Sequence, residues 1–234
     1  MFRFKQFKVD QSGCAMKINT DGVLLGALAE ADQPENILDI GTGTGVIALM
    51  LAQRFENSRI DAVEIDQSAA ETASRNFSNS PFAERMSLYS MGFEQFFESN
   101  PDKKYDLIVS NPPFYINSLK SPKADKQLAK HADADFFDRL IFNSSKHLAD
   151  NGLIYLILPL DTVVLVKEIA SKNGLFTRNV TSVSSYENSA PHREIVVLSL
   201  NDIKEVDDRF VIYKSPKIYT NQYYNALKDF FTIF

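Results

Sequence analysis

The chain has 234 residues, a formal net charge of −5 and a hydrophobic fraction of 44%. This length and apolar content suit one domain with a substantial core, and they exclude an intrinsically disordered chain. The single cysteine, Cys14, excludes an intrachain disulfide and indicates a reducing compartment.

The N-terminal part of the chain predicts an irregular or β-like segment followed by one helix. Residues 1–18 lack the apolar core of a signal peptide. Asn19 or Thr20 can cap a helix that runs to about Glu30, and Pro34 then breaks the chain. No apolar run approaches the length of a membrane span, so we expect a cytoplasmic protein with no membrane partner.

From Ile37 onward, short apolar runs that predict strands alternate with stretches of helical periodicity. The predicted strands are Asn36–Ile40, Arg59–Ile65, Met86–Tyr89, Tyr105–Ser110, Leu153–Leu158, Leu175–Val183 and Glu194–Leu200. The predicted helices are Gly45–Phe55, Gln67–Asn79, Phe93–Glu98, Asp135–Leu148, Thr162–Asn173 and Tyr223–Phe231. This alternation predicts a doubly wound, Rossmann-like α/β fold with mainly parallel strands. We expect a single domain, with residues 1–34 leading into a catalytic core at 35–200 and a tail at 201–234.

The four residues Asn111, Pro112, Pro113 and Phe114 directly follow the fourth predicted strand, and strand ends are where α/β folds bind ligands. The Asn111 amide oxygen and the Pro112 carbonyl can each accept one N–H of a planar amine. Two prolines stiffen the turn, and the Phe114 ring offers a face on which a flat base can stack. Residues 115–134 then show no clear periodicity and predict a functional or mobile loop.

A glycine-rich turn, Asp39–Gly45, lies between the first predicted strand and its helix, where glycines allow a ligand to approach the backbone. Asp39 would repel a pyrophosphate but can meet an ammonium group, and Glu64 at the second strand end can accept from both hydroxyls of a ribose. S-adenosylmethionine carries an amino acid, a ribose and a sulfonium without phosphate, so it fits better than a dinucleotide. Two alternatives stay open: Asp39 caps the following helix, and Asp66 binds the ribose or caps the next helix. Gly45 is predicted to pack closely against a helix.

The glycine turn and the Asn111–Phe114 motif make the chain similar to the class I S-adenosylmethionine-dependent methyltransferases. Within that class it resembles the amine-directed group, which carries a motif like Asn111–Phe114. More closely, it resembles the bacterial tRNA(Val) adenine-37 N6-methyltransferase family in the segments Met16–Gly26, Glu64–Asp66 and Tyr219–Phe231. The resemblance implies a seven-stranded, mostly parallel sheet with the last strand antiparallel. It also implies methylation of the N6 amine of an adenine in tRNA, at position 37 next to the anticodon of tRNA(Val).

The motifs and the resemblance together assign residues to three roles. The predicted catalytic residues are Asn111, Pro112, Pro113 and Phe114. The predicted cofactor-binding residues are Asp39, Gly41, Thr42, Gly43, Gly45, Glu64, Asp66, Ser90, Met91 and Asn111. The predicted substrate-binding residues are Lys17, Asp21, Lys120, Lys123 and Arg193. The chemistry requires no metal, and we expect a monomer.

The chain departs from the family pattern at two places. Ser90-Met91-Gly92-Phe93 follows the third predicted strand, where the wider superfamily often has an acid that accepts from the adenine amine of the cofactor. Gln222 stands in the tail where an acid is expected. The net charge of −5 also disfavours a nucleic-acid partner, although lysines cluster just after the Asn111 turn.

Three other functions remain open: methylation of a glutamine amide in a release factor, methylation of guanine N2 in rRNA, and a non-catalytic RNA-binding scaffold. Release-factor enzymes normally carry a longer helical domain before the glycine motif, whereas only 40 residues precede Gly41 here. The guanine-directed enzymes typically have a second domain. The intact glycine and Asn111–Phe114 motifs argue against a scaffold.

Overall fold

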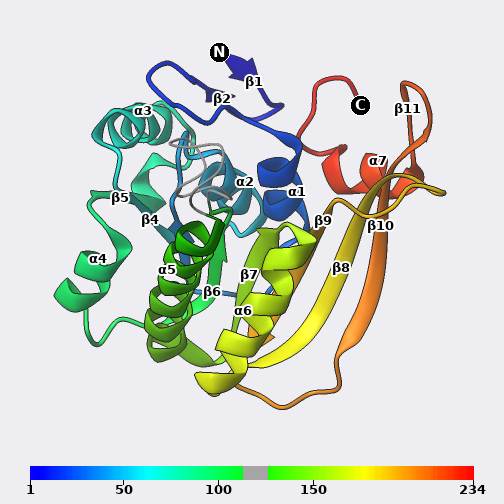
Figure 1. The fold of residues 1–234 in the computed structure, drawn as a ribbon. Helices are drawn as coiled ribbons and strands as arrows, with labels where there is room; N and C mark the ends of the chain where they lie inside the picture. Colours follow the sequence, from blue (N-terminus) through cyan, green and yellow to red (C-terminus); the bar gives the residue numbers. More distant parts are fainter. Residues whose placement is uncertain (113–125) are drawn as a thin grey trace.

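The computed structural model describes residues 1–112 and 126–234, and for residues 126–133 it describes the backbone only. Within that part of the chain, a nine-stranded sheet forms the centre of the molecule and helices cover both of its faces (Figure 1). A separate hairpin of β1 (Phe2–Arg3) and β2 (Lys8–Val9) begins the chain. The predicted doubly wound α/β fold is confirmed.

The strand order across the sheet is β11-β10-β8-β9-β7-β6-β3-β4-β5. The first seven of these strands in chain order are β3 (Asn36–Ile40), β4 (Arg59–Glu64), β5 (Met86–Ser90), β6 (Tyr105–Ser110), β7 (Leu148–Leu158), β8 (Phe176–Tyr186) and β9 (Arg193–Ser199). Strands β3 to β7 run parallel, whereas β9 is antiparallel to both β7 and β8. The expected seven-stranded core, with its last strand antiparallel, is therefore present.

Two further strands extend this core, β10 (Val206–Ser215) and β11 (Ile218–Tyr219). β10 pairs parallel with β8, and β11 pairs antiparallel with β10. The sequence predicted only a helix in the tail at residues 201–234, so both strands were missed. The first four residues of β10 are exposed and mostly charged, which hides the strand pattern in the sequence. The free edge of β8 supplies the backbone partners that make this segment a strand.

Two layers of helices cover the sheet, one on each face. The helices are α1 (Thr20–Leu28), α2 (Val46–Arg54), α3 (Gln67–Ser78), α4 (Phe93–Ser99), α5 (Lys126–His147), α6 (Leu160–Lys172) and α7 (Asn221–Leu227). Successive strand residues point to opposite faces, so the sheet contributes to two separate cores. Ile37 packs in the core shared with α1, α2, α3 and α7, whereas Leu38 packs in the core shared with α4, α5 and α6.

Helix α5 begins at Lys126, nine residues before the predicted start at Asp135. The loop predicted for residues 115–134 is therefore wrong for 126–134, and its residues 115–125 lie outside the described part of the chain. The first turns of α5 have no apolar stripe, but their lysine, glutamine and alanine residues favour a helix. In the part of the chain that is described, no helix combines the length and apolarity that crossing a bilayer requires.

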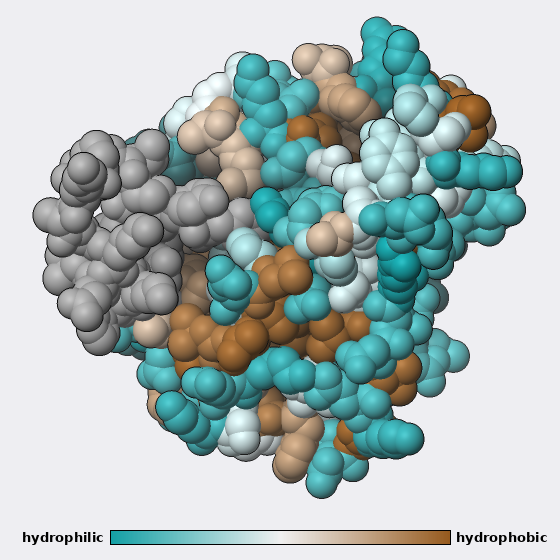
Figure 2. All heavy atoms as spheres, turned by 45° about the vertical axis from the view of Figure 1, so that its right-hand side comes forward, coloured by the Kyte–Doolittle hydropathy of each residue, from teal (hydrophilic) through white to brown (hydrophobic). Residues whose placement is uncertain are grey.

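The side of the molecule with β8 and β10 has a mixed surface. Hydrophilic residues cover most of it, and a band of hydrophobic residues crosses it (Figure 2). Phe176 of β8 and Val206 of β10 are 40% and 52% exposed. Helix α6 packs against β8 and β9 and leaves β10 partly uncovered on that face (Figure 1).

The N-terminal segment is attached to both the C-terminus and α3. The rings of Phe4 and Phe7 stack with centroids 4.5 Å apart, and Phe4 forms a β-bridge with Phe231. Farther along, Asp10 N donates to Asn76 Oδ1 at 2.8 Å, and Asn76 Nδ2 donates to Asp10 O at 2.9 Å. These contacts hold the segment that follows β2 against the carboxyl-end edge of the sheet.

Candidate active site

A cavity of about 520 Å³ lies where β3, β4, β5 and β6 end. Its walls include Cys14, Met16, Ile40, Gly41, Gly43, Glu64, Ile65, Asp66, Met91, Gly92, Phe93, Glu94, Ser110, Asn111, Pro112, Phe136 and Arg139. A larger groove of about 790 Å³ lies beside Arg54 and Phe210 and contains none of these residues. The cavity at the strand ends is the candidate site, because it contains both sequence motifs and has the position at which α/β sheets bind ligands.

Two glycines shape the floor of this cavity. Gly41 and Gly43 have φ angles of 72° and 56°, a left-handed conformation that favours glycine. A Cβ at either position would meet nothing within 4 Å, so both face open space. Gly45, with φ 81°, is different, since a Cβ there would collide with the ring of Phe77 in α3. Gly45 is a packing glycine, as predicted, and it lies outside the cavity wall.

The side chains of Asp39 and Thr42 in the glycine turn are buried and do not line the cavity. Asp39 Oδ2 accepts hydrogen bonds from Thr42 Oγ1 at 2.6 Å and from Ala48 N at 3.2 Å, so it holds the turn against the first turn of α2. Burial raises the pKa of Asp39 to about 7. The bond from Ala48 N matches the capping alternative for Asp39.

Glu64 lines the cavity and links the glycine turn after β3 to the residues after β4. Its Oε2 accepts from Gly43 N at 2.8 Å, and its Oε1 accepts from Asp66 N at 2.9 Å. Each carboxylate oxygen has a further lone pair, so the side chain can still accept from a hydroxyl in the cavity. Asp66 also lies in the wall, and its Oδ1 caps α3 by accepting from Ala69 N at 2.8 Å. The structure therefore gives Asp66 the capping role that the sequence left open.

The Oδ1 of Asn111 is a buried acceptor that has no hydrogen-bond partner among the described residues. The preceding residue, Ser110, is anchored by a hydrogen bond of 2.8 Å from its Oγ to Ile40 O. A buried acceptor without a donor costs about 1–3 kcal/mol, which a ligand with an N–H group would offset. Pro112 also lines the cavity, whereas Pro113 and Phe114 lie outside the described residues.

Several wall residues were not predicted from the sequence. Ile65 is 77% exposed in the cavity, and Met16 closes it from the N-terminal segment. Glu94 and Arg139 meet across the rim, with Arg139 Nε 3.1 Å from Glu94 Oε1. Glu94 could have been found, since it is an acid in the first turn of the helix after the third strand. Ser90, which was predicted as a cofactor residue, is exposed and does not line the cavity, whereas Met91 does.

Of the five residues predicted to bind substrate, Asp21 and Arg193 lie in contact. Arg193 at the start of β9 forms an ion pair with Asp21 of α1, with Nε and Oδ2 2.8 Å apart. This pair joins α1 to the sheet. Lys17 is exposed near the cavity wall, and Lys120 and Lys123 lie outside the described residues. Over residues 1–112 and 126–234, no group of three or more His, Cys, Asp or Glu side chains could hold a metal ion.

Comparison with known proteins assigns the family. Residues 16–161 match the family described as methyltransferase small domain. A relative from Pedobacter heparinus named tRNA1(Val) (adenine(37)-N6)-methyltransferase is 48% identical over 233 residues, covering 100% of this chain and 98% of the relative. A protein of the same name from Actinobacillus pleuropneumoniae is 38% identical over 98% of this chain and 96% of that protein. The chain belongs to the tRNA1(Val) (adenine(37)-N6)-methyltransferase family.

Solved structures share the fold of this family member. A protein from Agrobacterium tumefaciens, described as a predicted O-methyltransferase, superposes with a TM-score of 0.70 at 18% identity, covering 90% of this chain and 96% of that chain. TrmN from Thermus thermophilus superposes with a TM-score of 0.58 at 20% identity, covering 76% of this chain and 47% of that chain. Sequence identities this low show the fold alone. The family and the fold together confirm the class I methyltransferase that the motifs indicated.

Proposed function

We propose that this protein transfers a methyl group from S-adenosylmethionine to the N6 amine of adenine 37 in tRNA(Val). The observation that carries the proposal is the buried Asn111 Oδ1, which has no donor among the described residues and lies in a cavity at the strand ends. Full-length relatives at 38–48% identity that have this activity in their names support the choice of substrate. A tRNA substrate would also support the expected cytoplasmic location.

The residues of the cavity fit the proposed cofactor. The open turn at Gly41 and Gly43 can approach the methionine part, and Glu64 can accept from the ribose hydroxyls. Ile65 and Met91 present apolar surface on which the adenine can pack. When bound, the cofactor supplies an electrophilic methyl group on its sulfonium.

Asn111 and Pro112 would act on the amine that receives the methyl group. An exocyclic adenine amine is a weak nucleophile, because its lone pair is delocalised into the ring. As the nitrogen forms its new bond it becomes positive, and its two protons become stronger donors. Acceptors held at Asn111 Oδ1 and the Pro112 carbonyl stabilise that charge more than they stabilise the ground state, which is the condition for catalysis. Pro113 would stiffen the turn and Phe114 would stack on the base.

Replacing Asn111 tests this role. The Asn111→Ala variant should lower turnover on tRNA(Val) by about 100-fold or more, the scale of removing one preorganised polar group from an active site. Its affinity for S-adenosylhomocysteine, measured by calorimetry, should change far less. Asn225→Ala, an exposed asparagine of α7 away from the cavity, is the matched control. Unchanged turnover in Asn111→Ala would refute the role of this amide.

The substrate requires a separate measurement. Cofactor carrying a labelled methyl group should be incubated with pools of tRNA, rRNA and release factor, followed by mass spectrometry of the labelled product. Label at adenine 37 of tRNA(Val) is expected. Label chiefly in protein would favour the glutamine alternative, and label at guanine N2 in rRNA would favour the other methyltransferase alternative. The expected monomer can be checked by size-exclusion chromatography with light scattering.

A further inference from the structure

Four tyrosine rings form a continuous row across the outer strands of the sheet. The rings of Tyr186 at the end of β8 and Tyr213 of β10 have centroids 5.7 Å apart. Tyr219 of β11 stacks between Tyr213, at 5.1 Å, and Tyr223 of α7, at 4.5 Å. The inner ring, Tyr223, is 5% exposed, whereas Tyr186 at the other end of the row is 40% exposed and has Tyr213 as its one ring neighbour among the described residues. The row therefore ends in a ring on which another flat group can stack.

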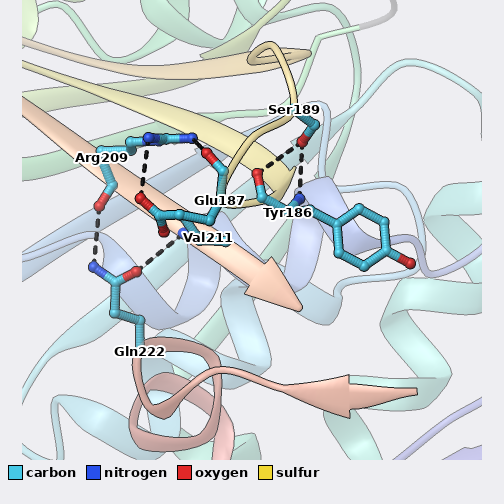
Figure 3. Close-up of polar contacts among 6 residues, drawn as sticks. All are labelled: Tyr186, Glu187, Ser189, Arg209, Val211 and Gln222. Carbon is cyan, nitrogen blue, oxygen red and sulfur yellow. Dashed lines mark hydrogen bonds and ion pairs between the residues drawn. The ribbon is translucent and has the colours of Figure 1, made fainter. Parts of the chain in front are cut away.

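The turn between β8 and β9 fixes the position of Tyr186. Tyr186 N donates to Ser189 Oγ at 2.8 Å, and Tyr186 O accepts from Ser189 N at 3.0 Å and from Ser189 Oγ at 2.8 Å. The next residue, Glu187, pairs with Arg209 of β10, with Oε1 and Nη1 3.2 Å apart. The Tyr186 ring points away from these contacts (Figure 3). A ring on a turn held in this way loses little conformational freedom when a ligand stacks on it.

The end of β8 projects beyond the strand ends that form the candidate active site. The strands β6, β7, β9 and β8 are consecutive in the sheet, so β8 lies about 14 Å from β6, which ends beside Asn111. In the paired register, Ser110 of β6 is level with Val180 of β8, and Tyr186 lies about 20 Å farther along that strand. One small ligand cannot touch both places. A nucleic acid can, since one strand advances about 3.4 Å per nucleotide.

The surface around Tyr186 is basic, in contrast to the chain as a whole, whose net charge is −5. The paired segments 186–193 and 213–224 contain a single acid, Glu187, and three cations, Arg193, Lys214 and Lys217. The ion pair with Arg209 neutralises the acid, whereas Lys214 and Lys217 are exposed. Exposed cations beside an exposed aromatic ring match the needs of unpaired RNA, because the cations attract phosphates and the ring stacks on a base.

We propose that Tyr186 stacks on an unpaired base of the tRNA outside the cavity, and that Lys214 and Lys217 contact its phosphates. The inference rests on the proposed function, and it adds where the RNA lies while its target adenine is held at Asn111. Stacking on an aromatic ring tolerates any base, and phosphate contacts carry no sequence information. This surface therefore contributes affinity and orientation rather than recognition of one base.

Fluorescence anisotropy with a labelled anticodon stem-loop of tRNA(Val) tests the aromatic contact. Tyr186→Ala should weaken binding by about tenfold, within the range for loss of one base–aromatic stack, and Tyr186→Phe should keep the affinity of the unmodified protein. Phe176→Ala is the matched control, because Phe176 is also 40% exposed but lies at the opposite end of β8. All three variants should bind S-adenosylhomocysteine like the unmodified protein, which shows that the cavity is intact.

The salt dependence of the same binding tests the lysines. Each phosphate contact to a single strand adds about 0.7 to the slope of log affinity against log salt concentration. The double variant Lys214→Gln and Lys217→Gln should therefore lower the slope by about 1.4. The control is Lys172→Gln and Lys204→Gln, two exposed lysines that precede β8 and β10, and it should keep the slope.

Three outcomes would contradict the proposal. Full RNA affinity in Tyr186→Ala, or an unchanged slope in the variant of Lys214 and Lys217, would overturn this surface, and methylation of tRNA by those variants would leave the proposed function standing. Loss of release-factor binding in place of RNA binding would overturn RNA as the occupant. An unmodified protein that binds no tRNA would overturn the inference together with the proposed function.

Discussion

Among single residues, Asp39 forms hydrogen bonds that hold the glycine turn, but its carboxyl group is buried, which disfavours its charged form. Its side chain is fully buried, and its Oδ1 has no hydrogen-bond partner among the described residues. Burial raises the pKa of Asp39 from 3.8 to about 7, although hydrogen bonds from Thr42 and Ala48 oppose the shift. Because the folded pKa lies above the unfolded one, the stabilising contribution of this group is complete below about pH 4. That contribution is lost as the pH rises through about 7.

The Asp39→Asn variant should therefore have a flatter pH dependence of stability. Asn keeps an oxygen that can accept from Thr42 and Ala48, but it carries no charge at any pH. Urea unfolding from pH 5 to pH 8 should show the unmodified protein losing stability relative to Asp39→Asn. The control is Asp32→Asn, which makes the same change at an exposed position. Parallel curves for the unmodified protein and Asp39→Asn would contradict the raised pKa.

At the scale of the elements, Gln222 of α7 completes the outer edge of β10. Its Nε2 donates to Arg209 O at 3.0 Å, and its Oε1 accepts from Val211 N at 3.0 Å (Figure 3). One amide thus occupies the place of a neighbouring strand along β10, where unpaired backbone groups would otherwise be exposed. The acid expected at this position from the family pattern could accept from Val211 N, but it could not donate to Arg209 O.

The Gln222→Glu variant should lower the free energy of unfolding by about 1 kcal/mol, the net value of one hydrogen bond. The cause is the lost donor to Arg209 O. Urea denaturation measures the change, and Gln95→Glu at an exposed position of α4 serves as the matched control. A variant as stable as the unmodified protein would show that the amide donor does not stabilise the edge of β10.

In the whole molecule, the two ends of the chain are joined to each other. Phe4 is buried and bridges to Phe231, and Lys5 N donates to Phe230 O at 2.8 Å. The same N-terminal segment continues to Cys14 and Met16, which line the cavity. The C-terminal residues thus support one wall of the site, although they are distant from it along the chain.

The Phe4→Ala variant should lower the free energy of unfolding by about 3 kcal/mol, because Phe4 is a fully packed aromatic side chain. It should also weaken binding of S-adenosylhomocysteine, since the segment that contains Cys14 and Met16 loses its anchor. Phe142→Ala removes a ring that is 42% exposed on α5, so both effects should be small there. Urea unfolding and calorimetry measure the two effects. Lower stability with unchanged affinity in Phe4→Ala would show that the Phe4 anchor does not support the cavity wall.

Much of the core and part of the site could be predicted, because their signals are local. The strands Asn36–Ile40 and Tyr105–Ser110 are short apolar runs, and they form as predicted. Gly45 was predicted to pack against a helix, and it does. The start of α5 and the strand β10 were missed, because charged residues interrupt the apolar pattern in both. Pairing with β8 made residues 206–215 a strand.

The alternating α/β core and the glycine turn follow from the sequence alone, because they depend on backbone geometry and on neighbours a few residues away. Contacts between side chains that are distant along the chain depend on the complete fold. Arg139 and Glu94 are 45 residues apart, and Arg193 and Asp21 are 172 apart. Such contacts leave no periodic trace in the sequence, since folding of the whole sheet is what brings these residues together. Asp39 and Glu64 were identified as candidates from the sequence. Their hydrogen bonds to Thr42 and Gly43 could not be predicted, because they depend on the folded conformation of the turn.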